Sequence, residues 1–292
     1  MCVDCGCSDG AKATVTNIKT GKVTELWRSI VTHLHEAGHI HDHSLDHTHD
    51  HSHGPGGHSH DHNHDHTHDH SHSHGIVDLQ QSILQKNDML AARNRAWLAG
   101  REVLMLNLVS SPGSGKTSLL ERTIRDLKGK HSISVIEGDQ ATANDGERIL
   151  AAGAAAIQVN TGTGCHLEAD MVQRGLEDLK PRPGSIVMVE NVGNLVCPAL
   201  FDLGEKAKVA ILSVTEGEDK PVKYPHMFRA ASLLLLNKID LLPHLDFDVA
   251  KALRFAREVN PKVEVIQVSA KSGAGMSEWY SWLEKNLAEV RI

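Results

Sequence analysis

The sequence predicts an α/β fold whose β-sheet is mostly parallel and covered by helices on both faces. From residue 103 onward, aliphatic runs alternate with stretches of helical periodicity. The runs lie at 103–109, 133–137, 156–160, 185–190, 208–214, 232–237 and 263–268, and the helical stretches at 118–127, 142–152, 166–179, 247–259 and 275–289. Strands that are apolar along their whole length are typical of parallel sheets buried on both faces. Because such sheets bind ligands at the carboxyl ends of their strands, we expect functional residues directly after each run.

Residues 1–32 form a first segment, which opens with the cysteines Cys2, Cys5 and Cys7. Thiolates are soft ligands, and three so close together suit nickel, zinc or copper. The alternative is a tail with idle thiols. Weak alternation of polar and apolar residues within 8–32 also suggests a small hairpin.

Residues 33–75 form a second segment of low complexity, in which eighteen of the 22 histidines lie between His33 and His74. The segment has no apolar content to bury, so we expect it to be disordered without metal. Its repeated His-x-His pattern with interleaved aspartates predicts a reservoir for several divalent ions. A solvated linker is the alternative.

Residues 76–292 are expected to form the folded domain, and its first element is a helix at 76–99. Apolar residues recur there near one helical face: Ile76, Leu79, Ile83, Leu84, Leu90 and Trp97. We expect this helix to pack on the domain or on a second subunit.

The first aliphatic run leads into Ser110-Ser-Pro-Gly-Ser-Gly-Lys-Thr117, and a helical pattern follows. Strand, glycine-rich turn and helix are the context of a phosphate-binding P-loop, although Ser110 stands where the first glycine is usual. Backbone N–H groups of such a loop cradle phosphates at a helix N-terminus. Lys116 is expected to reach the β- and γ-phosphates and Thr117 to hold Mg²⁺. The expected phosphate-contacting residues are Gly113, Ser114, Gly115, Lys116, Thr117 and Ser118.

Acidic residues follow two later strands of the predicted sheet. Asp139 lies just after the second run, in Glu137-Gly138-Asp139, where it is expected to face Mg²⁺ and the attacking water. Glu190 ends the fourth run, in the position of an acid that reaches Mg²⁺ through water, and the Gly193 N–H is expected to contact the γ-phosphate. Lys116, Thr117, Asp139 and Glu190 are therefore the candidate catalytic residues.

The last two strands carry a pattern that favours guanine. In Asn237-Lys238-Ile-Asp240, the Asp240 carboxylate is placed to accept both N1–H and the 2-amino group of guanine. Adenine would leave that acid unpaired, and hydrogen-bond readout of this kind discriminates by factors on the order of 10⁴. The backbone of Ser269, Ala270 and Lys271 is expected to contact the guanine O6. A P-loop kinase would need an acceptor site and a lid, and an ATPase would not need Asp240.

A second group of metal ligands is expected at the nucleotide edge of the sheet. Cys165 and His166 open the helical stretch after the third run, and Cys197 lies in the loop after Glu190. Two thiolates and an imidazole would make an open three-ligand site for zinc or nickel. Two buried structural cysteines and a surface histidine are the alternative.

Charge and hydropathy exclude other classes. The net charge of −7 gives no basic footprint for nucleic acid. No stretch approaches the length of apolar chain that spans a membrane, and no signal pattern opens the sequence, so we expect a cytoplasmic protein.

Taken together, these motifs resemble the HypB family, the nickel-inserting SIMIBI-class P-loop GTPases of hydrogenase maturation. The resemblance covers roughly 76–290 and depends on Ser110–Thr117, 137–139, 164–167, 190–198 and 237–240, with the N-terminal cysteines and the histidine tract as further matches. It implies a GTPase that binds GTP/GDP, Mg²⁺, Ni²⁺ and Zn²⁺ and delivers nickel to the hydrogenase large-subunit precursor. A HypA-type partner and GTP-linked homodimerisation are also implied.

Two other functions are weighed against this one. The urease accessory GTPases have a similar P-loop, but they carry Cys-Pro-His where this chain has Cys197-Pro198-Ala199. A nickel or zinc storage protein with a regulatory nucleotide domain is the other alternative.

Overall fold

The computed structural model describes residues 13–26, 72–139, 144–162 and 164–291. Within these residues a nine-stranded sheet has the order β2-β1-β5-β4-β6-β3-β7-β8-β9. The strands are β1 (Ala13–Asn17), β2 (Val23–Leu26), β3 (Leu104–Ser110), β4 (Ile133–Asp139), β5 (Ala155–Asn160), β6 (Ile186–Glu190), β7 (Ala207–Ser213), β8 (Ala231–Asn237) and β9 (Glu264–Gln267). From β5 to β9 every neighbouring pair is parallel, which confirms the predicted fold class.

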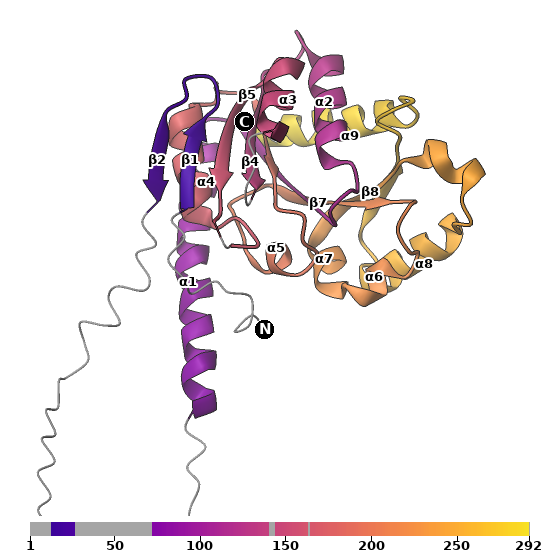
Figure 1. The fold of residues 1–292 in the computed structure, drawn as a ribbon, viewed down its shortest axis with the longest axis horizontal. Coiled ribbons are helices and arrows are strands. Elements are labelled where there is room, and N and C mark those ends of the chain that lie inside the picture. The colour runs from indigo at the N-terminus through magenta and orange to yellow at the C-terminus, as the bar shows by residue number, and fades with distance from the viewer. Residues whose placement is uncertain (1–12, 27–71, 140–143, 163, 292) are drawn as a thin grey trace, which may run out of the picture. The chain divides into compact units, whose positions relative to one another are not determined.

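Helices connect the strands as crossover units. They are α1 (His72–Ala99), α2 (Lys116–Leu127), α3 (Asn144–Ala152), α4 (Ala169–Leu179), α5 (Cys197–Leu200), α6 (Lys220–Lys223), α7 (Pro225–Ala230), the 3₁₀ helix η2 (Ile239–His244), α8 (Val249–Val259) and α9 (Met276–Val290). Figure 1 shows α2, α3 and α9 on one side of the strands and α7 and α8 on the other. No helix in the described part of the chain is long and apolar enough to cross a membrane.

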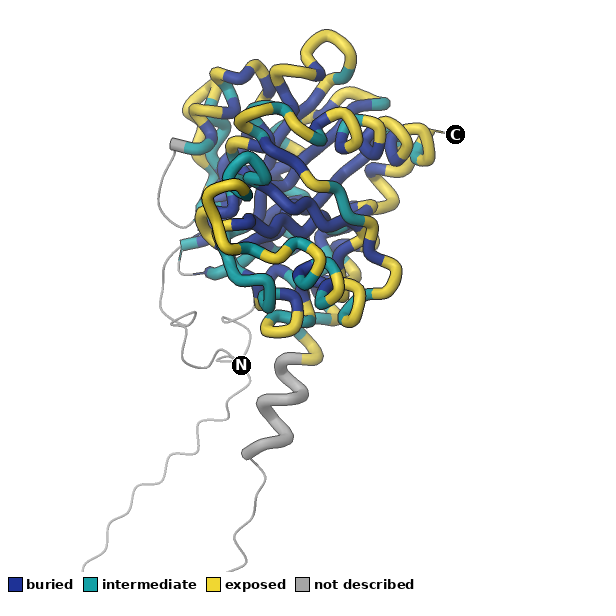
Figure 2. Tube along the Cα trace, turned by 90° about the vertical axis from the view of Figure 1, so that its right-hand side faces the viewer, coloured by how far each residue is buried: buried dark blue, intermediate teal, exposed yellow. Residues whose placement is uncertain are grey.

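The central strand β3 shows why the sheet is sandwiched between helices. All its residues are buried, and alternate side chains point to opposite faces. Leu104, Leu106 and Leu108 belong to the core under α2, α3 and α9, whereas Met105 packs in the core under α4. Figure 2 shows the buried residues gathered in the interior of the folded domain. A strand covered in this way is expected to be mostly apolar, and β3 is apolar except at Asn107 and Ser110.

The hairpin suggested by the weak alternation is present, and it extends the sheet. β1 and β2 are antiparallel, and β1 also pairs antiparallel with β5, opposite Ile157 to Asn160. Ala13 and Val15 are fully buried in the same core as Ile157. The sequence pattern indicated the hairpin but not that it joins the parallel sheet.

One helix start was wrongly predicted. The periodicity from residue 166 indicates a helix there, but α4 begins at Ala169, so Cys165 and His166 lie in the loop before it. The Leu167 N–H donates to the Asn191 side chain at 3.2 Å, and Glu168 has an extended backbone. This tertiary hydrogen bond holds the segment outside the helix.

Two compact units divide the chain, residues 1–27 with 83–292 and residues 28–82. Of the second unit, the structure describes residues 72–82, and for 72–80 only the helical backbone. The predicted cysteine motif and nearly all of the predicted histidine tract lie outside the described residues.

Candidate functional site

The turn between β3 and α2 has the backbone that its glycines predict. Gly113 and Gly115 have φ angles of 75° and 94°, in the left-handed region that favours glycine. A Cβ on Gly115 would lie 2.7 Å from the Asn237 side-chain nitrogen, so no larger residue fits without displacing Asn237. α2 begins at Lys116, so its N-terminus faces the turn. The loop therefore has the geometry of an anion cradle.

Ser110, the departure from the usual motif, is fully buried beneath this loop. Its hydroxyl oxygen accepts hydrogen bonds from Lys116 Nζ at 2.9 Å and from Ser114 Oγ at 2.6 Å. Its own O–H donates to the Ser111 carbonyl at 2.7 Å. Glycine would make none of these side-chain bonds. Ser110 thus holds the Lys116 ammonium, whose pKa burial lowers from its ordinary value.

A cavity of about 570 Å³ opens over the loop at the carboxyl ends of β3, β4 and β6. The residues predicted from sequence that line it are Gly113, Ser114, Gly115, Lys116, Thr117, Ser118, Asp139, Glu190, Gly193 and Lys238. Glu137, Asp145 and Arg148 also line it. The cavity lies where open α/β sheets bind their ligands.

Two buried carboxyl groups stand at the floor of this cavity. Glu190 Oε1 accepts a hydrogen bond from the Thr117 hydroxyl at 2.8 Å. Burial raises the pKa of Glu190 to about 7. Burial, followed by the neighbouring Glu190 charge, raises the pKa of Glu137 to about 9. One oxygen of each carboxyl has no hydrogen-bond partner among the described residues. Buried acceptor oxygens next to a hydroxyl are a donor set that fits a hard cation such as Mg²⁺.

Asp139 is the acid of β4 that the sequence indicates for the metal, whereas the structure brings Glu137 to Glu190. Glu137 is 3% exposed and lies deeper in the cavity floor, whereas Asp139 is half-buried at the end of β4. Glu137 and Glu190 are register partners on adjacent strands. The sequence does show that β4 and β6 each have a glutamate at or near the end. It does not show that β4 pairs with β6, which is what brings Glu137 and Glu190 together.

The predicted guanine-binding residues form two groups. Asn237 donates to the Ser114 carbonyl at 2.9 Å, and Lys238 Nζ donates to the Gly113 carbonyl at 2.6 Å. Asp240 accepts from the Ser269 hydroxyl at 2.6 Å. The first group fixes the phosphate loop, and the second places the Asp240 carboxyl beside the loop that contains Ala270 and Lys271.

Cys165, His166 and Cys197 are brought together, with one ligand atom from each within 4.8 Å of the others. Both cysteines are half-buried. His166 Nδ1 is 3.7 Å from Cys165 Sγ, and its Nε2 is 3.7 Å from a Glu168 oxygen. The Phe201 ring stacks on the imidazole at 3.9 Å between centroids. A carboxylate behind a ligating imidazole is a common orienting contact at metal sites, and Glu168 was not foreseen.

The loop from Glu190 to Cys197 contacts both the phosphate loop and the cluster of Cys165, His166 and Cys197. A second cavity, of about 380 Å³, is lined by Cys165, Gly193 and Asn194 together with Ser111 and Pro112 of the phosphate loop. Asn194 donates to the Cys165 carbonyl at 3.4 Å. The segment from Glu190 to Cys197 thus lines the cavity over the phosphate loop, here called the nucleotide cavity, at one end. At its other end it belongs to the cluster of Cys165, His166 and Cys197.

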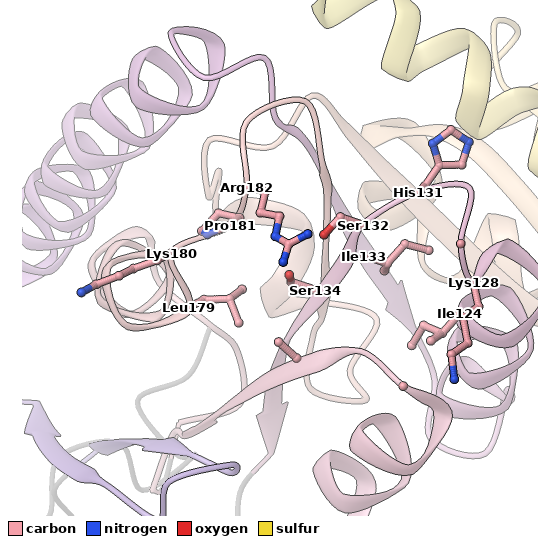
Figure 3. Close-up of a pocket in the computed structure, with 13 residues that line it drawn as sticks. Ile124, Lys128, His131, Ser132, Ile133, Ser134, Leu179, Lys180, Pro181 and Arg182 are labelled. Carbon is pink, nitrogen blue, oxygen red and sulfur yellow. The ribbon is translucent and has the colours of Figure 1, made fainter.

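A further cavity, of about 350 Å³, lies at the amino ends of β4 and β5, away from the phosphate loop. Figure 3 shows Arg182 directed into it toward Ser132 and Ser134, with Lys180 directed away. α2 ends before Lys128 and α4 before Lys180, so helix C-termini with partial negative charge meet here. Cations are stabilised at such ends, which accounts for these lysines without an anionic ligand.

The sequence is similar to a known family of nucleotide-binding domains and to several characterised proteins. Residues 104–267 match the CobW/HypB/UreG nucleotide-binding domain. The hydrogenase maturation factor HypB of Rhizobium leguminosarum bv. viciae is 59% identical over 217 residues, which are 74% of this chain and 73% of that protein. HypB of Escherichia coli K12 is 61% identical over 209 residues, 72% of each chain.

Two solved structures share the fold. The crystal structure of the hydrogenase maturation factor HypB from Archaeoglobus fulgidus aligns with a TM-score of 0.66 and 38% identity, covering 70% of this chain and 100% of that one. The crystal structure of HypB from Helicobacter pylori in complex with nickel aligns with a TM-score of 0.66 and 35% identity, covering 70% and 96%.

Proposed function

Since this chain belongs to the HypB family of hydrogenase maturation factors, we propose that it hydrolyses GTP and couples its nucleotide state to nickel delivery during [NiFe]-hydrogenase maturation. The observation that carries the proposal is the loop from Glu190 to Cys197, which joins the nucleotide cavity to the cluster of Cys165, His166 and Cys197.

GTP hydrolysis is proposed to depend on positioning and charge stabilisation, as in other phosphoryl transfers. The phosphate loop binds the phosphates, and Lys116 exchanges its bond to Ser110 for one to the β- and γ-phosphates. Thr117, Glu137, Asp139 and Glu190 would hold Mg²⁺ directly or through water, and the ion would neutralise charge on the phosphates. Asp139 orients the attacking water, and Gly193 contacts the γ-phosphate. Asp240 selects guanine, assisted by the backbone of Ser269, Ala270 and Lys271.

Nickel is the proposed cargo of the cluster of Cys165, His166 and Cys197. Two thiolates and an imidazole suit Ni²⁺ or Zn²⁺ and leave a coordination position open for transfer. When Gly193 moves to contact a γ-phosphate, Cys197 on the same loop changes its distance from Cys165. This makes metal affinity depend on the nucleotide, and by linkage makes nucleotide affinity depend on the metal.

We propose further roles for the other segments and partners. Residues 1–32 bring a metal site at Cys2, Cys5 and Cys7, residues 33–75 a nickel reservoir, and 76–292 the GTPase domain. The chain acts in the cytoplasm as a GTP-linked homodimer and exchanges nickel with a HypA-type chaperone and the hydrogenase large-subunit precursor.

A nickel-loading assay tests this function. Purified chain charged with nickel is mixed with metal-free hydrogenase large-subunit precursor, with GTP, GDP or a non-hydrolysable GTP analogue. We expect nickel to move to the precursor faster with GTP than with GDP or the analogue. Transfer at equal rates under all three conditions would instead indicate a nickel buffer, and transfer only to a urease precursor would indicate urease maturation.

A further inference from the structure

Helix α1 bonds to both segments that carry the clustered ligands, through two buried asparagines. Asn94 is 2% exposed, and its Nδ2 donates to the carbonyls of Ala169 at 2.8 Å and Leu203 at 3.0 Å. Asn87 is 5% exposed; its Oδ1 accepts from the Ala169 N–H at 2.9 Å, and its Nδ2 donates to the Asp202 carbonyl at 2.7 Å. Each asparagine thus joins the same two segments.

These two segments adjoin the ligands directly. Ala169 is the first residue of α4, immediately after the loop with Cys165 and His166. Asp202 and Leu203 follow the short helix α5, which begins at Cys197. Phe201, next to Asp202, stacks on His166. A shift of either segment relative to α1 would therefore change the separation between the cysteine–histidine pair and Cys197.

Helix α1 also packs closely against the second of these segments, which contains Asp202, Leu203 and Gly204. Gly204 has a φ of 89°, and a Cβ there would lie 2.6 Å from the Ala91 carbonyl oxygen and 2.7 Å from Asn94 Cβ. Arg95 donates two hydrogen bonds to the Asp202 carboxylate, at 2.8 and 2.7 Å. Burial alone would raise the pKa of Asp202, but the bonds from Arg95 and from the Gly204 N–H together hold it below its ordinary value.

The buried asparagines, more than the exposed ion pair, should fix this geometry. Removing the Asn94 amide takes away the donor that the structure gives the buried Leu203 carbonyl, and the Ala169 carbonyl loses its bond from outside α4; an unsatisfied buried acceptor is costly. The segments can relieve that cost only by moving to meet water or a new donor. An exposed ion pair such as Arg95–Asp202 stabilises weakly and constrains the segments less.

We propose that Asn87 and Asn94 are positioning residues for the metal cluster, fixing the separation of Cys165 and His166 from Cys197 so that the docking of α1 sets metal affinity. This inference rests on the proposed role of the cluster as a metal site. It gives α1, which leads out of the histidine-rich segment, a direct mechanical connection to the ligands of the folded domain.

The test uses the full chain with Cys2, Cys5 and Cys7 replaced by serine, so that Cys165 and Cys197 are the remaining thiols. Co²⁺ is the probe, because its thiolate charge-transfer absorption reports these two cysteines even while histidines bind cobalt elsewhere. Asn94→Ala, Asn94→Asp and Asn87→Ser are compared with the parent and with Arg93→Ala, an exposed neighbour on α1. Thermal unfolding and the affinity for a fluorescent GDP analogue are measured on each variant.

We expect the asparagine variants to need roughly tenfold more Co²⁺ to develop the thiolate band, the size of effect that partners of metal ligands produce. Arg93→Ala should match the parent, and GDP affinity should not change. If the asparagine variants lower only the unfolding temperature and keep the parent's Co²⁺ midpoint, α1 is merely structural and the inference is wrong. If the parent develops no thiolate band, the proposed metal site fails, and the positioning role fails with it. Should Asn94→Ala not fold, Asn87→Ser decides by the same midpoint.

Discussion

Glu137 and Glu190 are register partners on the parallel strands β4 and β6, and both carboxyl groups are buried beside Lys116. Each has a pKa above the ordinary 4.5, at about 9 and about 7. Without a cation, the folded chain therefore keeps protons on these groups that the unfolded chain has already released.

The first prediction is that the magnesium-free, nucleotide-free chain loses stability as pH rises. Between pH 4.5 and about 9 for Glu137, and between 4.5 and about 7 for Glu190, the folded state binds more protons than the unfolded state, so rising pH favours unfolding. Each group contributes at most about 1.4 kcal/mol per pH unit. Urea unfolding in EDTA at several pH values should show this decline, and Glu137→Gln should reduce its slope. Equal slopes in parent and variant would contradict the proton uptake by Glu137.

A second prediction concerns the base. Asp240→Asn should weaken GTP binding by a factor of hundreds or more and improve binding of xanthosine triphosphate, because the amide reverses the donor–acceptor pattern that guanine needs. Competition with a fluorescent nucleotide measures both. Asp246→Asn, at an exposed acid nearby, is the matched control. Equal GTP and ATP turnover in the unaltered chain would refute the guanine assignment.

The third prediction concerns Lys116, the cationic side chain of the phosphate loop. Lys116→Ala should abolish GTP hydrolysis, since the loss removes charge stabilisation of the transferred phosphoryl group. The fold should persist, because the side-chain hydrogen bond that Lys116 makes is to Ser110, only six residues earlier in the chain, and Glu137 and Glu190 can keep their protons when its charge is removed. Phosphate release and thermal unfolding are the two measurements. Lys130→Ala, on the exposed turn after α2, should retain full hydrolysis.

The fourth prediction addresses the contact behind His166. Glu168→Ala should weaken Co²⁺ or Ni²⁺ binding at the cluster by about tenfold, because the carboxylate near Nε2 orients the imidazole. Glu168→Gln, which keeps the size of the side chain but not its charge, should lose as much affinity as Glu168→Ala, because 3.7 Å is too long for a hydrogen bond and the contact acts through charge. An unchanged affinity in Glu168→Ala would show that the imidazole is held without this carboxylate.

The fifth prediction concerns a chain from which residues 33–74 have been deleted. The shortened chain should retain GTPase activity but lose most of its bound nickel, because the imidazoles of the tract are gone. In the full chain, nickel should be released below a pH of roughly 6, where imidazole protonates. Metal analysis after dialysis measures the stoichiometry. A shortened chain that binds as much nickel as the full one would remove the storage role.

The main elements of the folded domain could be predicted from sequence because their physical causes are local. β3 and β6 are buried on both faces, so their sequences are apolar except at Asn107, Ser110 and Glu190. The phosphate loop was found because Gly113 and Gly115 supply a backbone that other residues avoid. The clustering of Cys165, His166 and Cys197 followed from the rule that strand carboxyl ends share one edge.

What the sequence did not reveal depends on contacts between distant segments. The Leu167–Asn191 hydrogen bond delays the start of α4, and nothing near Leu167 in the sequence indicates it. Glu137 gained its place beside Glu190 from the strand order. Nothing in the sequence distinguishes Asn87 and Asn94 from other polar positions of an amphipathic helix, because their partners Ala169, Asp202 and Leu203 lie in other parts of the chain.

The coupling of nucleotide and metal is tested most directly by one titration. The full chain with Cys2, Cys5 and Cys7 replaced by serine is titrated with Ni²⁺ in the presence of Mg²⁺ and either GDP or a non-hydrolysable GTP analogue, and thiolate-to-nickel absorption is recorded. Cys165→Ala and Cys197→Ala in the same background establish that the signal comes from the cluster. We predict different nickel affinities in the two nucleotide states. Identical affinities, or no thiolate-bound nickel in either state, would contradict nucleotide-controlled delivery from this site.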